Sequence, residues 1–312
     1  MLFFPSLAIV TLTVVTIASG EHWKSPNFKS LATARQECAL YLHMSNDTIG
    51  SCSRNGYPDE PKIRNLVHCM LINVNAWDEN NKLKQHVLKN FFKPTDSDTC
   101  YENRTRDCLE KIDLPHRDTI GRAYSSFLCY YRQYGNVVEE EQFIPYRDNT
   151  RRQLMTEALA IENVPRHVLE KISEGKFLDL KEAPNLVFTY TVRTGFYEPP
   201  IGTNFGRLYT QHGVPELLNE AQCCEATIRR QYYEEPTRAY QTFKQCVSHL
   251  VSTLEMVKSV AKDLLKAPKT PYCGSCGSPA PYGRYGSSTC NICGRSNDIT
   301  TGKPRGCYYG QC

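Results

Sequence analysis

The sequence predicts an all-α protein made of two related helical domains, and three observations support this. Apolar residues recur at helical spacing along most of the chain, strand-like alternation is scarce, and a short motif is repeated 116 residues apart, from Arg122 to Arg238 (238 − 122 = 116). Fifteen cysteines follow an apolar N-terminal segment, which indicates secretion and disulfide bonding.

The N-terminal segment is typical of a secretory signal peptide. Residues 2–18 are almost continuously apolar, and the small residues Ala18 and Gly20 end the run. We expect residues 1–20 to be removed after Gly20; a retained membrane anchor is the alternative, but the run is short for a bilayer span. No later segment is long enough for one, so the sequence predicts a secreted, extracellular protein without stable membrane insertion.

The charge balance does not indicate a nucleic-acid-binding surface. The chain has 37 Lys and Arg against 33 Asp and Glu, a formal net charge of +4, and the two signs are interspersed. This balance does not favour a nucleic-acid partner.

The helical pattern is clearest in two segments, from Asp59 to Trp77 and from about Thr237 to Leu265. Residues 186–192 (LVFTYTV) have strand propensity. We interpret them as a helix because the internal repeat aligns them with part of the helix at 59–77.

The repeat extends beyond its core motif. Arg122–Phe127 recurs as Arg238–Phe243, and the same offset carries Cys108 onto Cys224. With one inserted residue it also carries Cys129 onto Cys246, and further upstream Cys69 falls on Phe188. The predicted organisation is a signal peptide (1–20), a first helical domain (21–137), a linker (138–150), a second helical domain (151–266) and an irregular Cys/Gly/Pro-rich tail (267–312).

The cysteines and two short segments resemble one protein family. The first domain has six cysteines, namely Cys38, Cys52, Cys69, Cys100, Cys108 and Cys129. Residues 66–71 (LVHCML), Trp77–Asn80 and Val192–Glu198 resemble the third helix and following turn of insect odorant-binding proteins. Over residues 25–265 the chain resembles the two-domain, "atypical" odorant-binding proteins of mosquitoes and the related long D7 salivary proteins.

The resemblance implies a disulfide framework. Carried over to this sequence, the family's interlocked pattern gives Cys38–Cys69, Cys52–Cys108 and Cys100–Cys129. The family's second cysteine precedes the third by one helical turn, where this chain has Asn65, so the place of Cys52 departs from the pattern. In the second domain Phe188 takes the third-cysteine place, and Cys246 is expected to pair with Cys224 or Cys223.

The tail contains a CxxC–x13–CxxC pattern formed by Cys273, Cys276, Cys290 and Cys293. In a reducing compartment this spacing would indicate a zinc site. In a secreted protein disulfides are the better interpretation. We therefore expect no metal and no cofactor, with zinc at these four cysteines as the alternative.

The chain lacks the signatures of common enzymes: HExxH, GxSxG and a phosphate-binding glycine loop are absent. It is expected to have no catalytic residues and to act as a non-catalytic binding protein. The resemblance implies a cavity for a small hydrophobic molecule. Its candidate lining residues are Met70, Trp77, Phe91, Phe92, Tyr124 and Phe127 in the first domain, and Phe188, Phe196, Tyr209, Tyr240 and Phe243 in the second.

Three functions follow. The first is extracellular transport of odorants or other semiochemicals in olfaction. The second is D7-like scavenging of host biogenic amines or lipid mediators, and the third is protein interaction without a small-molecule ligand. Candidate partners are the small hydrophobic ligand, an olfactory receptor and a second copy of the chain.

Overall fold

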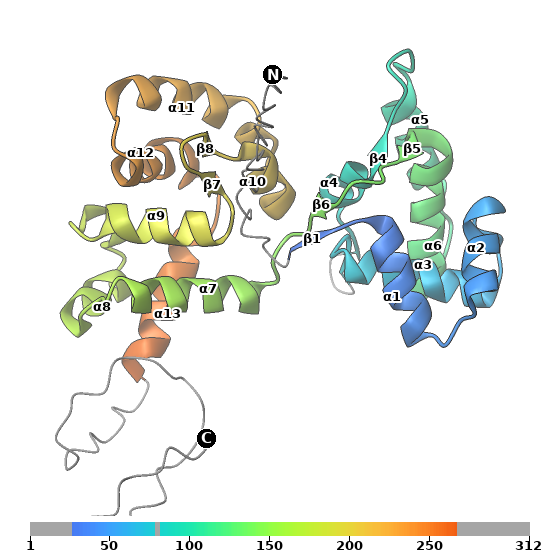
Figure 1. Ribbon diagram of the computed structural model, residues 1–312, viewed down its shortest axis with the longest axis horizontal. Helices are drawn as coiled ribbons and strands as arrows, with labels where there is room; N and C mark the ends of the chain where they lie inside the picture. The colour runs from blue at the N-terminus through green and yellow to red at the C-terminus, as the bar shows by residue number, and fades with distance from the viewer. Residues whose placement is uncertain (1–26, 79–81, 267–312) are drawn as a thin grey trace, which may run out of the picture. The chain divides into compact units, whose positions relative to one another are not determined.

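The computed structural model describes residues 27–78 and 82–266 (Figure 1). The described residues are mainly helical, so the predicted all-α class is confirmed. The predicted signal peptide and the cysteine-rich tail, with its candidate zinc ligands, lie outside the described residues. None of the described helices combines the length and apolarity needed to cross a membrane.

Two groups of elements are arranged around separate hydrophobic cores. We call residues 31–137 the first module. Its elements are α1 (Leu31–Tyr41), α2 (Asn46–Arg54), α3 (Pro61–Asn73), β2 (Trp77–Asp78), β3 (Lys82–Leu83), α4 (Gln85–Leu88), the 3-10 turn η1 (Lys89–Phe91), β4 (Phe92–Lys93), α5 (Tyr101–Glu110), α6 (Thr119–Cys129), the π turn η2 (Tyr130–Tyr134) and β5 (Asn136–Val137).

Residues 148–266 form the second module. Its elements are α7 (Asp148–Ile161), α8 (Arg166–Ser173), the 3-10 turn η3 (Phe177–Asp179), α9 (Ala183–Arg193), β7 (Tyr197–Glu198), β8 (Gly202–Thr203), α10 (Phe205–His212), the 3-10 turn η4 (Pro215–Leu217), α11 (Glu220–Gln231), α12 (Glu235–Thr242), the π turn η5 (Phe243–Val247) and α13 (Thr253–Lys266).

Local sequence explains where several helices begin. The hydroxyl of Ser30 accepts a hydrogen bond from the backbone N–H of Thr33 at the start of α1, and the carboxylate of Asp118 accepts one from Gly121 at the start of α6. Such caps satisfy N–H groups that have no partner within the helix. Pro61 occupies the first position of α3, where its missing N–H costs nothing.

The strands are short and antiparallel. β2 pairs with β3 and β7 pairs with β8, so each forms a small hairpin after the central helix of its module. β4 pairs with β5 within the first module. β1 (Phe28–Lys29) pairs with β6 (Gln142–Phe143), which joins the start of the described chain to the segment between the modules.

Central helices organise both modules. In the first module α3 packs against α1 and α6; in the second, α9 packs against α12 and α7 (Figure 1). The second module also has α13, which packs against α8 and α7. Burial of one apolar face of each helix is the main source of stability in such a fold.

Backbone hydrogen bonds recur between the modules at a fixed offset. After α3, Ala76 N–H donates to the carbonyl of Leu71; after α9, Phe196 N–H donates to Thr191, an offset of 120 (196 − 76 = 120). The turns after α1 and α7 show the same offset, because Met44 N–H donates to Ala39 and Val164 N–H to Leu159. This recurrence supports the predicted duplication.

The offset of 120 corrects one residue of the sequence alignment. Thr189, not Phe188, occupies the place of Cys69, and Ala158 occupies the place of Cys38. The second module therefore has threonine and alanine where the first has a disulfide. Sequence matching missed this by one residue because segments with little identity can be aligned in either register, whereas the recurring backbone hydrogen bonds fix the register.

The π turn η5 accounts for the residue inserted between Phe243 and Cys246 in the repeat. A π turn holds one residue more than the equivalent α-helical turn, and η5 spans Phe243–Val247. The predicted continuous helix from Thr237 to Leu265 is therefore wrong: α12 ends at Thr242, and α13 begins at Thr253 after η5 and a turn. The helix predicted to reach Trp77 ends at Asn73, and Trp77 lies in β2.

Three disulfides join described cysteines, namely Cys38–Cys69, Cys108–Cys129 and Cys224–Cys246. Their Cα–Cα distances of 5.8, 5.6 and 5.7 Å suit a disulfide. The first is the pair implied by the family resemblance, and the third is one of the two expected alternatives.

The other two implied pairs, Cys52–Cys108 and Cys100–Cys129, do not form. Cys108 bonds to Cys129 because α5 packs against α6. Cys100 lies at the N-cap of α5, two turns before Cys108, and is exposed, whereas Cys52 is buried on α2. Among the described residues Cys52, Cys100 and Cys223 have free thiols.

Candidate ligand-binding site

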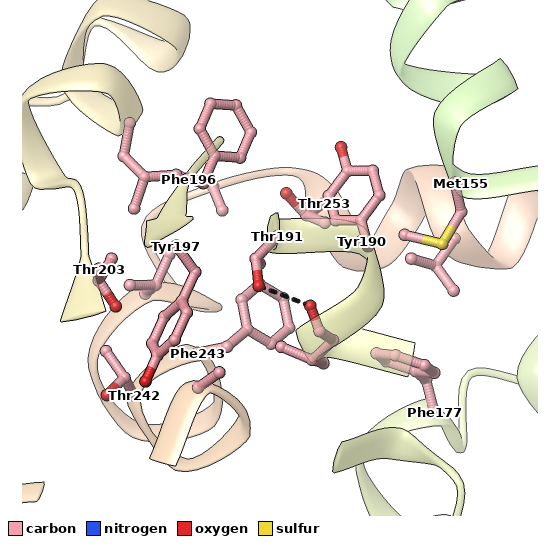
Figure 2. A pocket seen from close by; sticks show the side chains of 16 residues that line it. Met155, Phe177, Tyr190, Thr191, Phe196, Tyr197, Thr203, Thr242, Phe243 and Thr253 are labelled. Carbon is pink, nitrogen blue, oxygen red and sulfur yellow. Dashed lines mark hydrogen bonds between the residues drawn. The ribbon is translucent and has the colours of Figure 1, made fainter. Parts of the chain in front are cut away.

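A cavity lies inside the second module (Figure 2). Its wall is formed by helices α7, α9, α10, α12 and α13, together with the 3-10 turn η3, the π turn η5 and the β7–β8 hairpin. The lining residues are Met155, Phe177, Val187, Tyr190, Thr191, Phe196, Tyr197, Thr203, Leu208, Ala239, Thr242, Phe243, Val247, Val251, Thr253 and Val257.

The cavity is narrow as it stands. The space between the lining atoms measures about 550 Å³ including its open mouth, but the centre of a water molecule can occupy only about 30 Å³ of it. That inner space suits one or two waters. A ligand of ordinary size would have to displace side chains such as Met155 and Phe243, which appear in Figure 2 around the space.

No charged side chain lines the cavity. Its polar groups are the hydroxyls of two tyrosines and four threonines. Thr191 donates its hydroxyl back to the carbonyl of Val187 at 2.7 Å, the dashed bond in Figure 2. Burial raises the pKa of Tyr190, so its hydroxyl stays protonated. The wall is thus apolar with a few neutral hydroxyls.

The hydroxyl of Tyr197 is used by the protein itself. It donates to Oε2 of Glu235 at 2.6 Å and accepts from Nε of Arg238 at 2.8 Å. Arg238 also forms an ion pair with Glu235 and donates to the carbonyl of Pro200. Burial and the Glu235 carboxylate raise the pKa of Tyr197 to about 12. Tyr197 therefore presents its ring, not its hydroxyl, to the cavity.

Thr242 differs from the other polar groups. Among the described residues, four buried side-chain polar atoms lack a hydrogen-bond partner: Nε of Arg35, Nε1 of Trp77, Nε of Arg151 and Oγ1 of Thr242. Of these residues Thr242 lines the cavity and the other three do not. It is 1 % exposed.

Of the five lining residues predicted in the second module, two line the cavity and three do not. Phe196 and Phe243 line the cavity. Tyr240 is buried but donates its hydroxyl to the carbonyl of Leu178. Phe188 lies one position from the cavity-lining face of α9, with its ring against Tyr197, and Tyr209 lies beside Lys89.

The predicted lining residues of the first module are packed into its core. All six, Met70, Trp77, Phe91, Phe92, Tyr124 and Phe127, are buried there. Phe127 packs against Tyr57, and the hydroxyl of Tyr124 donates to the carbonyl of Tyr57 at 2.7 Å. Tyr124 also borders an open groove with charged residues of both signs, including Asp59 and Arg64.

Sequence reasoning missed most of the wall. Val187, Tyr190 and Thr191 lie on one face of α9 at helical spacing, a signal that the sequence contains. The contributions of Thr203, Thr242 and Thr253 have no such signal, because a threonine on a helix or hairpin is ordinarily exposed or structural. Within residues 27–78 and 82–266 no cluster of His, Cys, Asp and Glu could hold a metal ion.

Comparisons with known proteins agree with the helical, disulfide-bonded architecture. The sequence profile of the PBP/GOBP family matches residues 20–133. General odorant-binding protein 69 of Anopheles gambiae is 29% identical over 121 residues, which is 35% of this chain and 52% of that protein. The chain thus spans about half the length of that relative, and no solved structure shows significant similarity to it. Residues 20–133 of this chain are therefore similar to the PBP/GOBP family of odorant-binding proteins.

Proposed function

We propose that this protein binds and transports small hydrophobic molecules in extracellular fluid, and that the binding site is the cavity of the second module. The observation that carries the proposal is a wall of apolar side chains and neutral hydroxyls inside a helical module. Sites for small apolar ligands are concave, mostly apolar and contain few polar groups. The family match of the first module supports the same function. On this proposal the protein is not an enzyme.

The composition of the wall favours a neutral ligand over a biogenic amine. An amine bound away from water needs a carboxylate partner. Two carboxylates that contact lining residues are already engaged: Glu235 binds Tyr197 and Arg238, and Glu225 accepts a hydrogen bond from the backbone of Thr203 at 2.9 Å. The amine-scavenger alternative therefore has no support from this cavity.

The proposal places binding in the second module rather than in both. In the first module the equivalent aromatic residues fill their own core, for example Phe127 against Tyr57 and Phe92. In the second module α13 contributes Thr253 and Val257 to the cavity wall. The first module has no helix in this position, since η2 is followed by β5.

A variant with a larger side chain in the cavity wall tests whether this cavity is the binding site. Ala239 lines the cavity, so Ala239→Leu adds three carbons to a space that is already narrow. Purified protein should bind N-phenyl-1-naphthylamine saturably, and this variant should bind it at least about tenfold more weakly. Ala226→Leu makes the same change on the exposed side of α11 and should bind normally.

Melting curves of both variants establish that they are folded. If Ala239→Leu binds the probe as tightly as the unmodified protein, the cavity is not the site. If the unmodified protein shows no saturable binding, the carrier function is wrong and a protein-interaction role becomes the better interpretation.

A further inference from the structure

The unpartnered hydroxyl of Thr242 is the feature of the cavity that the fold itself does not explain. A buried hydroxyl without a hydrogen bond costs free energy, since it gives up water and gains nothing. Proteins keep few such groups, and each one that persists needs an explanation such as strain, a catalytic role or a bound molecule. Thr242 is almost completely buried, and it lines the apolar cavity of the second module.

Several other threonines, in helices or at a helix end, avoid the cost of an unpaired hydroxyl. Each donates its hydroxyl to the carbonyl one turn earlier in its own helix, as threonines in helices commonly do. These are Thr105, Thr156, Thr191, Thr194 and Thr210. The corresponding acceptor for Thr242 is the carbonyl of Arg238, and no bond to it forms.

Thr242 lies at the junction between α12 and the π turn η5. π turns inserted in helices are frequent at functional sites. Figure 2 shows Thr242 on the same side of the view as Tyr197 and Thr203. The hydroxyl of Tyr197 donates to Glu235 and accepts from Arg238, and no hydrogen bond joins it to Thr242.

We propose that Thr242 is the hydrogen-bond anchor of the cavity, and that the ligand is an uncharged, mainly apolar molecule with one oxygen acceptor, such as a ketone, ester or alcohol. The hydroxyl of Thr242 donates to this oxygen, and the surrounding apolar wall holds the hydrocarbon part. This inference rests on the proposed function, because it assigns the ligand class of the same cavity.

The test compares two ligands of equal shape. In 2-methyl-1-octene a methylene group replaces the carbonyl oxygen of 2-octanone and C2 stays planar, so the pair differs in one acceptor. Displacement of N-phenyl-1-naphthylamine measures both affinities in each variant, and their ratio is independent of the fraction of folded protein. The ratio of the two affinities in the unmodified protein is the reference value, because the hydrocarbon gains more than the ketone from leaving water whether or not an anchor is present.

Thr242→Val removes the hydroxyl and keeps the shape. The ketone-to-hydrocarbon affinity ratio should fall about two- to tenfold, the value of one ordinary hydrogen bond. Affinity for the hydrocarbon should stay the same or rise, and the melting temperature should not fall. Thr242→Ser keeps the hydroxyl and should keep the ratio of the unmodified protein.

Thr194→Val is the matched control. Thr194 is a buried threonine at the C-cap of α9, but its hydroxyl donates to the carbonyl of Tyr190 and it does not line the cavity. The ketone-to-hydrocarbon affinity ratio of Thr194→Val should equal that of the unmodified protein. Should Thr242→Val be too unstable to study, Thr242→Ala gives the same comparison.

The outcomes separate the two proposals. If the probe binds but the ketone-to-hydrocarbon affinity ratio is unchanged in Thr242→Val, the anchor is wrong and the carrier function stands. If neither probe nor ketone binds the unmodified protein, both are wrong.

Discussion

The hydroxyl of Tyr197 donates a 2.6 Å hydrogen bond to the carboxylate of Glu235, 38 residues further along the chain. This bond joins the β7–β8 hairpin to the start of α12 across one side of the candidate cavity. Arg238 completes the arrangement by donating to the same hydroxyl. Tyr197 and Arg238 are buried, so their hydrogen bonds are expected to contribute to the free energy of unfolding.

We predict that Tyr197→Phe lowers the free energy of unfolding by about 1–2 kcal/mol, since hydrogen bonds to charged partners contribute about this much. Glu235 and Arg238 remain paired with each other, which limits the loss. Chemical denaturation measures the change. Tyr233→Phe is the control, because Tyr233 is 86% exposed and should lose almost nothing. Equal stabilities of the two variants would show that the Tyr197 bond does not contribute.

The register between α3 and α9 gives a second prediction. If Ala158 and Thr189 correspond to Cys38 and Cys69, the pair Ala158→Cys and Thr189→Cys should form a disulfide. Both pairs are separated by 31 residues (189 − 158 = 31). The new bridge should add about 3 kcal/mol to stability. Mass spectrometry of unreduced peptides identifies it.

The control for this register moves one cysteine by a single position. Phe188→Cys with Ala158→Cys directs the second thiol to another face of α9, because successive helical residues differ by about 100°. No bridge should form there. A bridge at 188 and none at 189 would restore the alignment of Cys69 with Phe188.

Thiol labelling tests the revised cysteine framework. Cys100 and Cys223 are exposed and should react with iodoacetamide in the folded protein. Cys52 should react only after unfolding, because it is buried and burial raises the pKa of its thiol to about 11. Tryptic peptides should show Cys108 linked to Cys129. A Cys52–Cys108 peptide would overturn the observed pairing.

Acid should weaken the second module through His212. Burial, with Arg151 and His86 nearby and Asp148 opposing them, lowers the pKa of His212 to about 4. Its unfolded value is about 6.5. Between these values the unfolded chain binds a proton that the folded protein does not, so stability is full above about pH 6.5 and falls as the pH approaches 4.

His212→Asn should remove this contribution. The unmodified protein should be the more stable at pH 7, and its advantage should shrink by on the order of 2 kcal/mol by pH 4.5, allowing for partial exposure of the ring. Urea denaturation at both pH values measures the difference. His249→Asn on the exposed surface is the comparison. An advantage that does not change with pH would exclude His212 as the titrating group.

Much of the architecture could be predicted from the sequence because it depends on local pattern. The periodicity of apolar residues indicated helices, and the internal repeat identified residues 186–192 as helical despite their strand propensity. The offset between Cys129 and Cys246 already contained the extra residue that η5 accommodates. The same repeat aligned Cys108 and Cys129 with Cys224 and Cys246, which agrees with the observed disulfides. The pairs Cys52–Cys108 and Cys100–Cys129 were predicted instead because the family pattern was given more weight.

What the sequence determined by itself was the helical class, the repeat and the cysteines available for bonding, because each depends on residues a few positions apart or on simple matching. The tertiary structure decided which cysteines pair, where the helix predicted over 237–265 is interrupted, and which side chains enclose a cavity. Periodicity shows that a helix has an apolar face, but not what that face packs against. Phe127 and Phe243 align in the repeat, yet one fills a core and the other borders a cavity, because the second module has α13 and the first has no equivalent helix.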